Sequence, residues 1–507
     1  MNEAVPPSDQ SKGVQPLENA PCVDTAPNAA PSDHPPVTAR PPRGGRDLTS
    51  GPIARTLVLF AVPTLLANVL QSLNGSVNSI WVGRFLGEDA LAATTNANII
   101  MFLLFSVVFG FGMAATVMIG QSIGRGNVDA ARRALGSALG FCIGLTLITV
   151  SAGWIFAPDI LRALSTPAGV YPLALAYLRV IFLGMPAGMI TVILMMGLRG
   201  AGDALTPLWF MILSVVLDSG LNPVFILGLG PAPAMGIAGS ATATLIAGYT
   251  SLTALIIYCY AKDKVVRLRG PELRYLIPDP AELKVIISKG LPMGLQMIVM
   301  SSAMLAIIGF INREGVLMAA AYGASQQLWN YVQMPAMAVG AAVSAMAAQN
   351  IGAGRWDRVG RITRSGVVLN VVMTGVPVAI LLVFDRPMLA LFLGSGSPAI
   401  EVGRHIQLLA SWTFILFGVT MVLFSTMRAN GVVIAPLIIL IISLFAVRLG
   451  FYFLAYPHIG ADAIWYSFPA GSAASLVMAS YVYLKGDWRK KQLNVPGMGH
   501  VPAVVSE

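Results

Sequence analysis

Residues 121–133 read QSIGRGNVDAARR, and residues 349–361 read QNIGAGRWDRVGR. The two stretches agree at six of thirteen positions, with a shift of 228 residues between them. A second pair, RGAGDALTPL from Arg199 and RANGVVIAPL from Arg428, repeats at a shift of 229. Because two separate matches share almost one spacing, the sequence predicts that the chain is a duplication of one structural unit.

The composition places both copies in a membrane. Of the 507 residues, 56% are hydrophobic and only 11% are charged, whereas a soluble domain carries roughly 25% charged residues. Apolar runs of about 18–25 residues fit helices that cross a hydrocarbon layer about 30 Å thick. The sequence therefore predicts an all-α polytopic membrane protein with twelve transmembrane helices, at about 55–80, 92–118, 132–156, 172–198, 205–229, 236–260, 284–311, 317–346, 361–384, 402–427, 433–455 and 462–484.

Each copy holds six of these spans, and an even number makes the two repeats parallel. Parallel repeats place a substrate site between the halves, near the middle of the membrane. With both termini in the cytoplasm, 25 of the 32 Lys and Arg residues lie on the cytoplasmic side and six on the other, as the positive-inside rule requires. The predicted parts are a disordered proline-rich cytoplasmic tail, an N-terminal six-helix lobe, a cytoplasmic linker, a C-terminal six-helix lobe and a cytoplasmic tail, at 1–50, 51–261, 262–283, 284–485 and 486–507.

One acidic residue stands alone in the fifth span. Residues 214–228 read SVVLDSGLNPVFILG, and Asp218 is the only charged side chain from 204 to 230. An ionised carboxylate at the bilayer centre costs at least about 2.5–3.5 kcal/mol, so such a residue points to function, typically in a proton relay. Ser214 and Asn222 lie one turn before and after it on the same helical face. We expect all three in a proton- or ion-coupling pocket; the alternative is a neutral acid that ties helices together.

The first span carries a similar polar stripe. Gln71, Asn74 and Asn78 follow one another at spacings of three and four residues, which puts them on one helical face. We assign Asn78 to the ion-coupling pocket and Gln71 and Asn74 to the substrate cavity. Polar residues of this kind also commonly join membrane helices to one another.

The second half offers a cation and a methionine stripe. Arg448 lies within the eleventh span, one residue beyond the position that corresponds to Asp218 at a shift of 229. Two roles fit it: lining the cavity, or binding a carbonyl cluster in its own lobe. In the seventh span four methionines share one face, and flexible thioethers suit a surface that accepts many shapes. Ordinary packing is the alternative. We assign to the substrate cavity Gln296, Met297, Met300 and Arg448.

The remaining chemistry-bearing residues are sparse. The three Cys and four His are scattered without ligand spacing, so we expect no metal, cofactor or enzymatic activity. The glycine-rich repeats lack the Lys-Ser/Thr ending of a phosphate-binding loop. The basic residues lie between apolar runs, which excludes nucleic acid as the partner that a pI of about 9.6 would otherwise suggest.

Several motifs in order resemble the multidrug and toxic compound extrusion (MATE) transporters. This resemblance covers residues 52–485 and rests on PTLLANVLQSLNGSVNSIWVGRFLG, GLPMGLQ, AAYGASQ and MPAMAVGAAVSAMAAQNIGAG, at residues 63–87, 290–296, 320–326 and 334–354. It implies two six-helix lobes arranged as a V around a central cavity. It also implies secondary antiport of organic, often cationic, compounds against protons or sodium.

The sequence also departs from that family's pattern. Asn78 stands where the first span commonly carries an Asp, and Met300 stands where one branch has a Glu. Asp218 falls where the DinF-like branch has an acidic residue, so within the family the chain most resembles that branch. The resemblance implies that the first, fifth and sixth spans meet, which would bring Thr244 to the ion-coupling pocket.

These observations predict a proton-driven antiporter that exports amphipathic, mainly cationic, small molecules by alternating access. Sodium coupling is an open alternative, because one carboxylate with several carbonyl oxygens can hold Na⁺. A flippase for lipid-linked or anionic substrates, and a channel or scaffold, are further alternatives. We expect a monomer in a bacterial inner membrane, surrounded by the lipid bilayer.

Overall fold

The computed structural model describes residues 47–163, 166–167, 169–229 and 233–490, and every regular element among them is helical. The all-α fold expected from the sequence is therefore confirmed. Most of the predicted tails lies outside the described residues. The first six helices are α1 (Ile53–Leu86), α2 (Glu88–Gly124), α3 (Val128–Ala163), α4 (Tyr171–Gly200), α5 (Leu205–Leu227) and α6 (Ile237–Ala261).

The second half repeats this order with more interruptions. A short 3₁₀ helix, η1 (Gly270–Leu276), leads into it, and η3 (Asp487–Arg489) follows it. Between them lie α7 (Pro280–Arg313), α8 (Val316–Gly352), α9 (Trp356–Val383), α10 (Asp385–Leu393), α11 (Ala399–Ala410), α12 (Thr413–Ala429), α13 (Ile434–Ile441), the π-helical segment η2 (Ile442–Leu449), α14 (Gly450–Ile459) and α15 (Asp462–Lys485).

The helices match the predicted spans. Ten helical stretches in the described part of the chain are long and apolar enough to cross a membrane, with α13, η2 and α14 forming one of them. The tenth predicted span is broken: α11 and α12 meet at an angle of 41° and together would make an eleventh crossing. The twelfth predicted span coincides with α15, a helix of 24 residues.

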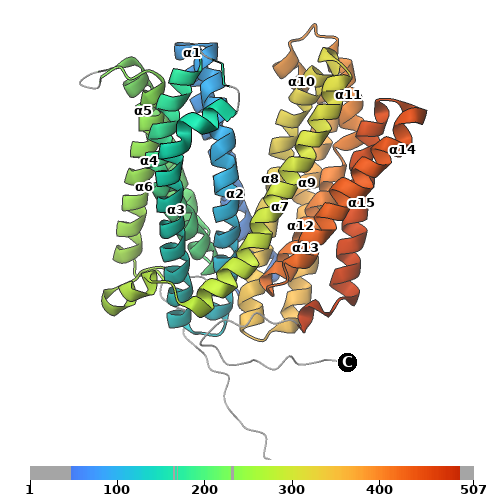
Figure 1. Cartoon of the computed structure of the whole chain (residues 1–507). Coiled ribbons are helices and arrows are strands. Elements are labelled where there is room, and N and C mark those ends of the chain that lie inside the picture. Colours follow the sequence, from blue (N-terminus) through green and yellow to red (C-terminus); the bar gives the residue numbers. More distant parts are fainter. Residues whose placement is uncertain (1–46, 164–165, 168, 230–232, 491–507) are drawn as a thin grey trace, which may run out of the picture. The chain divides into compact units, whose positions relative to one another are not determined.

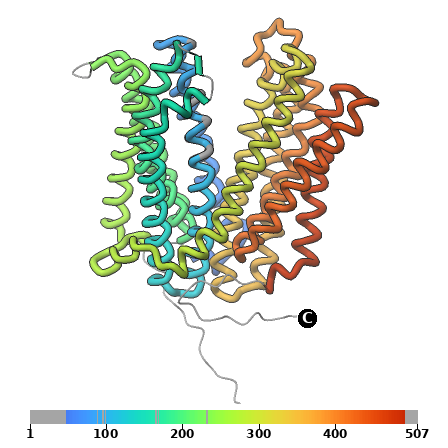
Figure 2. The backbone as a smooth tube through the Cα atoms, in the orientation of Figure 1, coloured from blue at the N-terminus to red at the C-terminus, as the bar shows by residue number. Residues whose placement is uncertain are grey.

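The helices form two bundles (Figure 1). Helices α1–α6 make the first bundle and α8–α15 the second, while α7 starts beside α2 and α3 and runs across to the second bundle (Figure 2). The bundles meet at the end where α2 and α8 finish and diverge toward the other end, which is the two-lobed V that the sequence resemblance implied.

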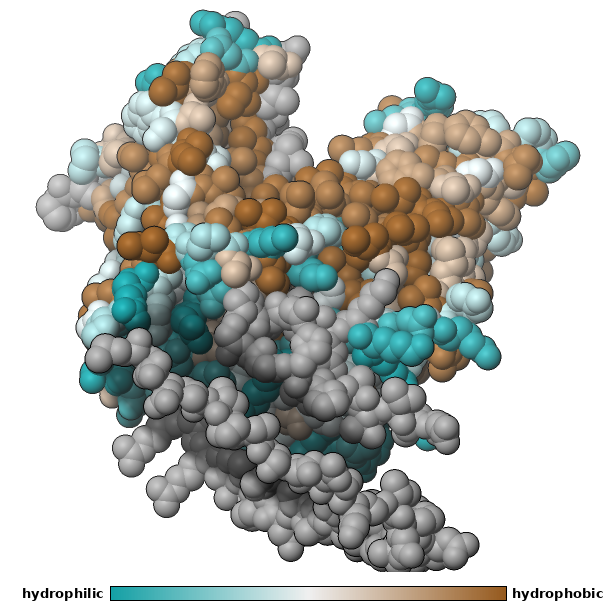
Figure 3. Space-filling view, turned by 60° about the horizontal axis from the view of Figure 1, so that its bottom comes forward, coloured by the Kyte–Doolittle hydropathy of each residue, from teal (hydrophilic) through white to brown (hydrophobic). Residues whose placement is uncertain are grey.

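The outer surface suits lipid. Large apolar side chains such as Ile148 and Ile155 on α3 are about 70% exposed, and a broad hydrophobic belt crosses the face shown in Figure 3. Hydrophilic residues gather at the end that comes forward in that view. Apolar exposure on this scale marks a membrane-embedded surface.

The predicted linker packs on the first bundle. At Gly136 and Gly140 of α3, an added Cβ would overlap the backbone of Tyr275 and Leu276, so only glycine lets η1 lie this close. The Arg132 guanidinium forms a salt bridge with the Glu272 carboxylate at 2.6 Å. The Ser137 hydroxyl donates a hydrogen bond to the Glu282 carboxylate at 2.6 Å. The connection between the bundles is therefore fixed to α3.

Candidate coupling site and substrate cavities

The first bundle encloses a cavity of about 330 Å³ among α1, α2, α4, α5 and α6. Among the described residues of its lining, Asp218 is the only one with a charged side chain. The sequence predicts that Gln71, Asn74, Asn78, Ser214 and Thr244 belong to this region, and all five line the cavity. Polar residues that the sequence reading did not select, Asn98 and Tyr177, also line it.

Three helices supply hydrogen bonds to the Asp218 carboxylate, which is 2% exposed. The Asn74 amide on α1 donates to Oδ2 at 2.8 Å, and the Thr244 hydroxyl on α6 donates to Oδ1 at 2.9 Å. The Asn222 amide, one turn along α5, donates to Oδ1 at 3.3 Å and to the Asp218 carbonyl at 2.9 Å. A charged acid held by several donors can persist in a low-dielectric site.

The two asparagine amides around Asp218 each also have an acceptor oxygen that is not hydrogen-bonded. The Oδ1 atoms of Asn74 and Asn222 are buried and have no hydrogen-bond partner among the described residues. An amide that turns about its last bond presents oxygen in place of nitrogen, and a threonine hydroxyl can donate or accept. The same three side chains can therefore bind the carboxylate or the protonated acid.

The remaining predicted coupling residues lie nearby. Asn78, one turn beyond Asn74, accepts a hydrogen bond from the Ser240 hydroxyl on α6 at 2.6 Å. Ser214 lines the cavity one turn before Asp218, and Gln71 is an exposed residue of the same lining. The structure thus brings α1, α5 and α6 together at one polar cluster, as the resemblance implied.

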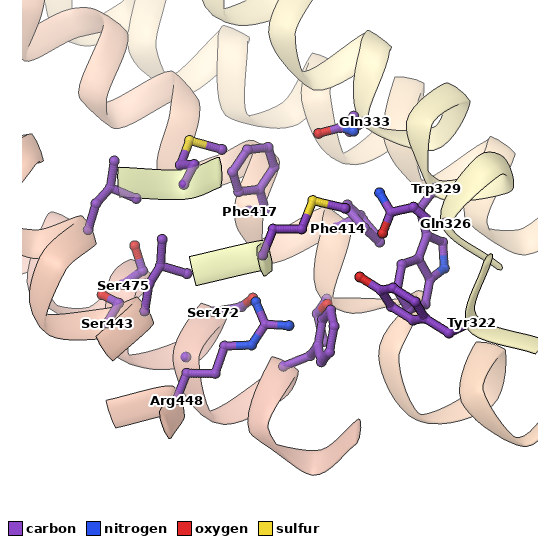
Figure 4. Close-up of a pocket in the computed structure, with 17 residues that line it drawn as sticks. Tyr322, Gln326, Trp329, Gln333, Phe414, Phe417, Ser443, Arg448, Ser472 and Ser475 are labelled. Atoms are coloured by element: carbon purple, nitrogen blue, oxygen red, sulfur yellow. The ribbon is translucent and has the colours of Figure 1, made fainter. Parts of the chain in front are cut away.

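A second cavity, of about 160 Å³, lies in the second bundle (Figure 4). Of the four residues in the second half that we assigned to the substrate cavity, Met300 and Arg448 line it. Gln296 and Met297 do not belong to the lining of either cavity. Gln296 is buried, donates to the Val433 carbonyl at 3.2 Å and accepts from the Arg428 guanidinium. The structure therefore places Gln296 in a contact between helices, and its substrate role stays a prediction.

The repeated glutamines join the two bundles. The Gln121 amide at the end of α2 donates to the Ala429 carbonyl of α12 at 2.7 Å, and the Gln349 amide at the end of α8 donates to the Gly200 carbonyl of α4 at 3.0 Å. Both donors and both acceptors are related by the internal repeat. Each bundle thus caps a helix end of the other, and we call these reciprocal bonds the glutamine latch.

Glycines make this approach possible. A Cβ added to Gly352 would lie 2.8 Å from the Gln121 Cα and would overlap its carbonyl oxygen. A Cβ on Gly124 would meet the Gln349 backbone in the same way. The motif that revealed the duplication therefore forms a close backbone contact between the bundles.

The last residues of the predicted N-terminal tail bind to the second bundle beside the glutamine latch. Leu48 is 1% exposed; its backbone N–H donates to Gln349 Oε1 at 3.1 Å, and its carbonyl accepts from the Asn350 amide at 3.0 Å. Arg355 and Arg358 on the second bundle donate to the carbonyls of Thr49 and Gly51. The segment before α1 thus ties the first helix to the second bundle.

Comparisons with known proteins agree with this architecture. A family model described as MatE matches twice, at residues 63–224 and 292–454, once in each half. The chain is 36% identical over 441 residues to "Probable multidrug resistance protein YoeA" of Bacillus subtilis, covering 87% of this chain and 95% of that protein. It is 26% identical over 345 residues to the "FAD transporter" of Shewanella oneidensis, covering 68% and 75%.

A solved structure shares the fold. It is described as the outward-facing conformation of a multidrug resistance MATE family transporter of the MOP superfamily, and it matches with a TM-score of 0.78 at 21% identity, covering 87% of this chain and 97% of that one. The family match and the relatives named as multidrug resistance proteins identify the chain as a membrane transporter and not as an enzyme. The chain belongs to the MatE family of multidrug efflux transporters.

Within the described residues, no group of three or more His, Cys, Asp or Glu side chains is placed to hold a metal ion. The groups that surround Asp218 in the first cavity are amides and a hydroxyl.

Proposed function

We propose that this transporter is an antiporter that exports amphipathic organic cations in exchange for protons, with Asp218 as the proton carrier. The observation that carries the proposal is the position of Asp218: it is the only charged group among the described residues that line the first cavity, and donors from three helices bind it. An acid buried at membrane depth is costly, so its presence favours a role in ion coupling.

The neighbours of Asp218 support exchange of a proton. In the carboxylate form, Asn74, Thr244 and Asn222 all donate to it. After protonation the acid needs an acceptor, and the unpaired Oδ1 atoms of the two asparagines offer one after an amide rotation. A cationic substrate in the same cavity stabilises the carboxylate form, so that substrate binding and proton binding oppose each other.

The glutamine latch supports alternating access. In this conformation the bundles meet at the end that carries the loops predicted to be cytoplasmic, so the site faces the opposite, outer side. Return to the inward-facing state requires both Gln121 and Gln349 bonds to break while each bundle moves as a unit. The proposal also includes the predicted orientation, in which both termini lie in the cytoplasm and the protein spans a bacterial inner membrane.

Both cavities lie within one chain, which supports action as a monomer. A sodium-coupled exporter is the main alternative, because Asn78 takes the place of a second acid and the amide oxygens remain available to Na⁺. A flippase for lipid-linked or anionic substrates is less well supported, because the described residues of each cavity lining include one charged group.

The test is transport in proteoliposomes that contain the full chain. Ethidium efflux is driven by an imposed pH gradient in one arm and by an imposed sodium gradient in the other. We expect the pH gradient alone to drive efflux in the wild type and Asp218→Asn to abolish it. The matched control is Asp159→Asn, which neutralises an exposed acid on α3. Efflux driven only by sodium would establish the alternative coupling, and undiminished efflux by Asp218→Asn would remove Asp218 from the mechanism.

A further inference from the structure

The cavity in the second bundle has the opposite polarity to the first. Its walls include aromatic and thioether side chains from α7, α8, α12 and α15, and Arg448 is the only charged residue among the described residues of its lining. The labelled side chains of Figure 4 show the guanidinium directed into this space, with Tyr322 and Gln326 across from it. The two bundles therefore present one acid and one base at nearly equivalent places of the repeat.

Arg448 has no protein partner that accounts for its charge. It makes no hydrogen bond or ion pair with a described residue, and its buried Nε has no partner. Its guanidinium lies 3.5 Å from the centre of the Phe468 ring. A cation–π contact with a single ring offsets only part of the cost of placing an arginine in a membrane. The donors of this side chain remain available to a ligand.

The local backbone directs Arg448 toward the cavity. It lies in the π-helical segment η2, and π-helical turns are rare and frequently occur at functional sites. Gly471 on α15 lets this segment approach, because an added Cβ there would be 3.2 Å from the Arg448 Cβ. A helix with ordinary winding would carry the side chain on a different face.

The polar groups around Arg448 suit an anion. The hydroxyls of Tyr322, Ser472 and Ser475 line the same cavity. A guanidinium binds a carboxylate with two parallel N–H···O bonds, and neighbouring hydroxyls can donate further bonds to the same oxygens. A cation is disfavoured here, because Arg448 is itself positively charged and the described residues of the lining include no carboxylate.

The apolar walls of the cavity indicate the chemical nature of the part of the ligand that is not anionic. The cavity of about 160 Å³ is close in size to one that holds a benzene ring. Trp329, Phe414, Phe417 and Phe468 surround it, and aromatic rings favour stacked or edge-to-face contacts with one another. We infer that this cavity binds the carboxylate end of an aromatic amphiphile, with Arg448 as the anion-binding residue.

This inference deepens the proposed function by adding acidic and zwitterionic aromatic compounds to the substrates. It rests on the proposed function only in assuming that bound compounds are exported. A zwitterion would place its cationic group in the first cavity and its carboxylate in the second at successive stages of transport.

The test is equilibrium binding by calorimetry to the purified full chain in neutral detergent. The probes are 1-naphthoate, the neutral 1-naphthamide, the cationic 1-naphthylmethylammonium and the aliphatic octanoate. We expect wild type to prefer 1-naphthoate, and Arg448→Gln to weaken its binding about 10- to 100-fold, because hydrogen bonds to a charged group are lost. Tyr322→Phe should weaken it by about 3- to 10-fold, because one neutral donor is lost.

Arg179→Gln is the matched control: it removes an arginine that also lies over an aromatic ring, Trp154, but lines neither cavity. Its affinity for 1-naphthoate should equal that of wild type. Unchanged affinity in both Arg448→Gln and Tyr322→Phe would overturn the inference, and so would octanoate binding as tightly as 1-naphthoate, which would indicate a lipid tail. No gradient is involved, so failure here leaves proton coupling through Asp218 untouched, and failure of proton coupling leaves this result standing.

Discussion

Substituting Gly352 by alanine tests the contact between the bundles. The new methyl group would lie 2.8 Å from the Cα of Gln121, whereas two carbon atoms normally approach to about 3.5–4.0 Å. The ends of α2 and α8 must therefore separate by roughly 1 Å, which breaks the geometry of the glutamine latch. Overpacking of this kind costs about 1–3 kcal/mol. Because the strain exists only where the bundles meet, the cost falls on this conformation alone.

A penalty of about 1–3 kcal/mol changes a conformational equilibrium about 5- to 150-fold. The population in which these ends are apart should rise by that factor in Gly352→Ala. The readout is the distance between two spin labels at Asp129 and Asp357, which are exposed and occupy equivalent places in the repeat. The labels require a background in which Cys22, Cys142 and Cys259 have been replaced.

The control for this experiment is Gly323→Ala on the same helix, where an added Cβ has no atom within 4 Å. We expect the label distances to lengthen in Gly352→Ala and to stay at wild-type values in Gly323→Ala. Equal distance distributions in Gly352→Ala and wild type would refute the reasoning. The same shift in both variants would also refute it, because the effect would then come from alanine in α8 and not from the contact with α2.

Three further predictions follow from named contacts. Gln349→Leu removes both hydrogen bonds of that side chain and should lower the unfolding free energy by about 1–3 kcal/mol, read as a lower thermal midpoint in detergent. Trp329→Phe deprives two buried polar partners of the indole donor and should cost a similar amount in the same assay. Asn78→Asp adds a carboxylate to the cavity of Asp218. Ethidium efflux should then respond to a sodium gradient, because more oxygen ligands become available to a hard cation. An unchanged response to sodium would show that residues 78 and 218 do not bind Na⁺ together.

Two features of the site could be predicted from the sequence: the internal duplication and the isolated acidic residue in the membrane. The Gln121 and Gln349 motifs revealed the duplication because they recur, and the isolated charge of Asp218 revealed a site because an acid is expensive in a membrane. Helical spacing related Asn222 to Asp218 directly. The partners on other helices, Asn74 and Thr244, could be reached only through resemblance, because spacing along one helix does not say which helices meet.

The sequence could not predict contacts between segments that lie far apart along the chain. Gln296 shares a helical face with the methionines, yet it binds Arg428 and Val433, which no periodicity indicates. The break in the tenth span lies where Ser411 and Gln407 bind Trp329, a contact that hydropathy does not register. Arg448 lies in a π-helical segment that no pattern in the sequence indicates.

The central claim is that Asp218 gives up its proton when substrate binds. The most direct measurement is the number of protons released per ethidium bound, followed with a pH indicator in weakly buffered detergent solution at a pH where the free protein is protonated. Wild type should release about one proton, and Asp218→Asn should bind ethidium with no release. Equal proton release by both proteins would contradict the account, because the proton would then come from another group.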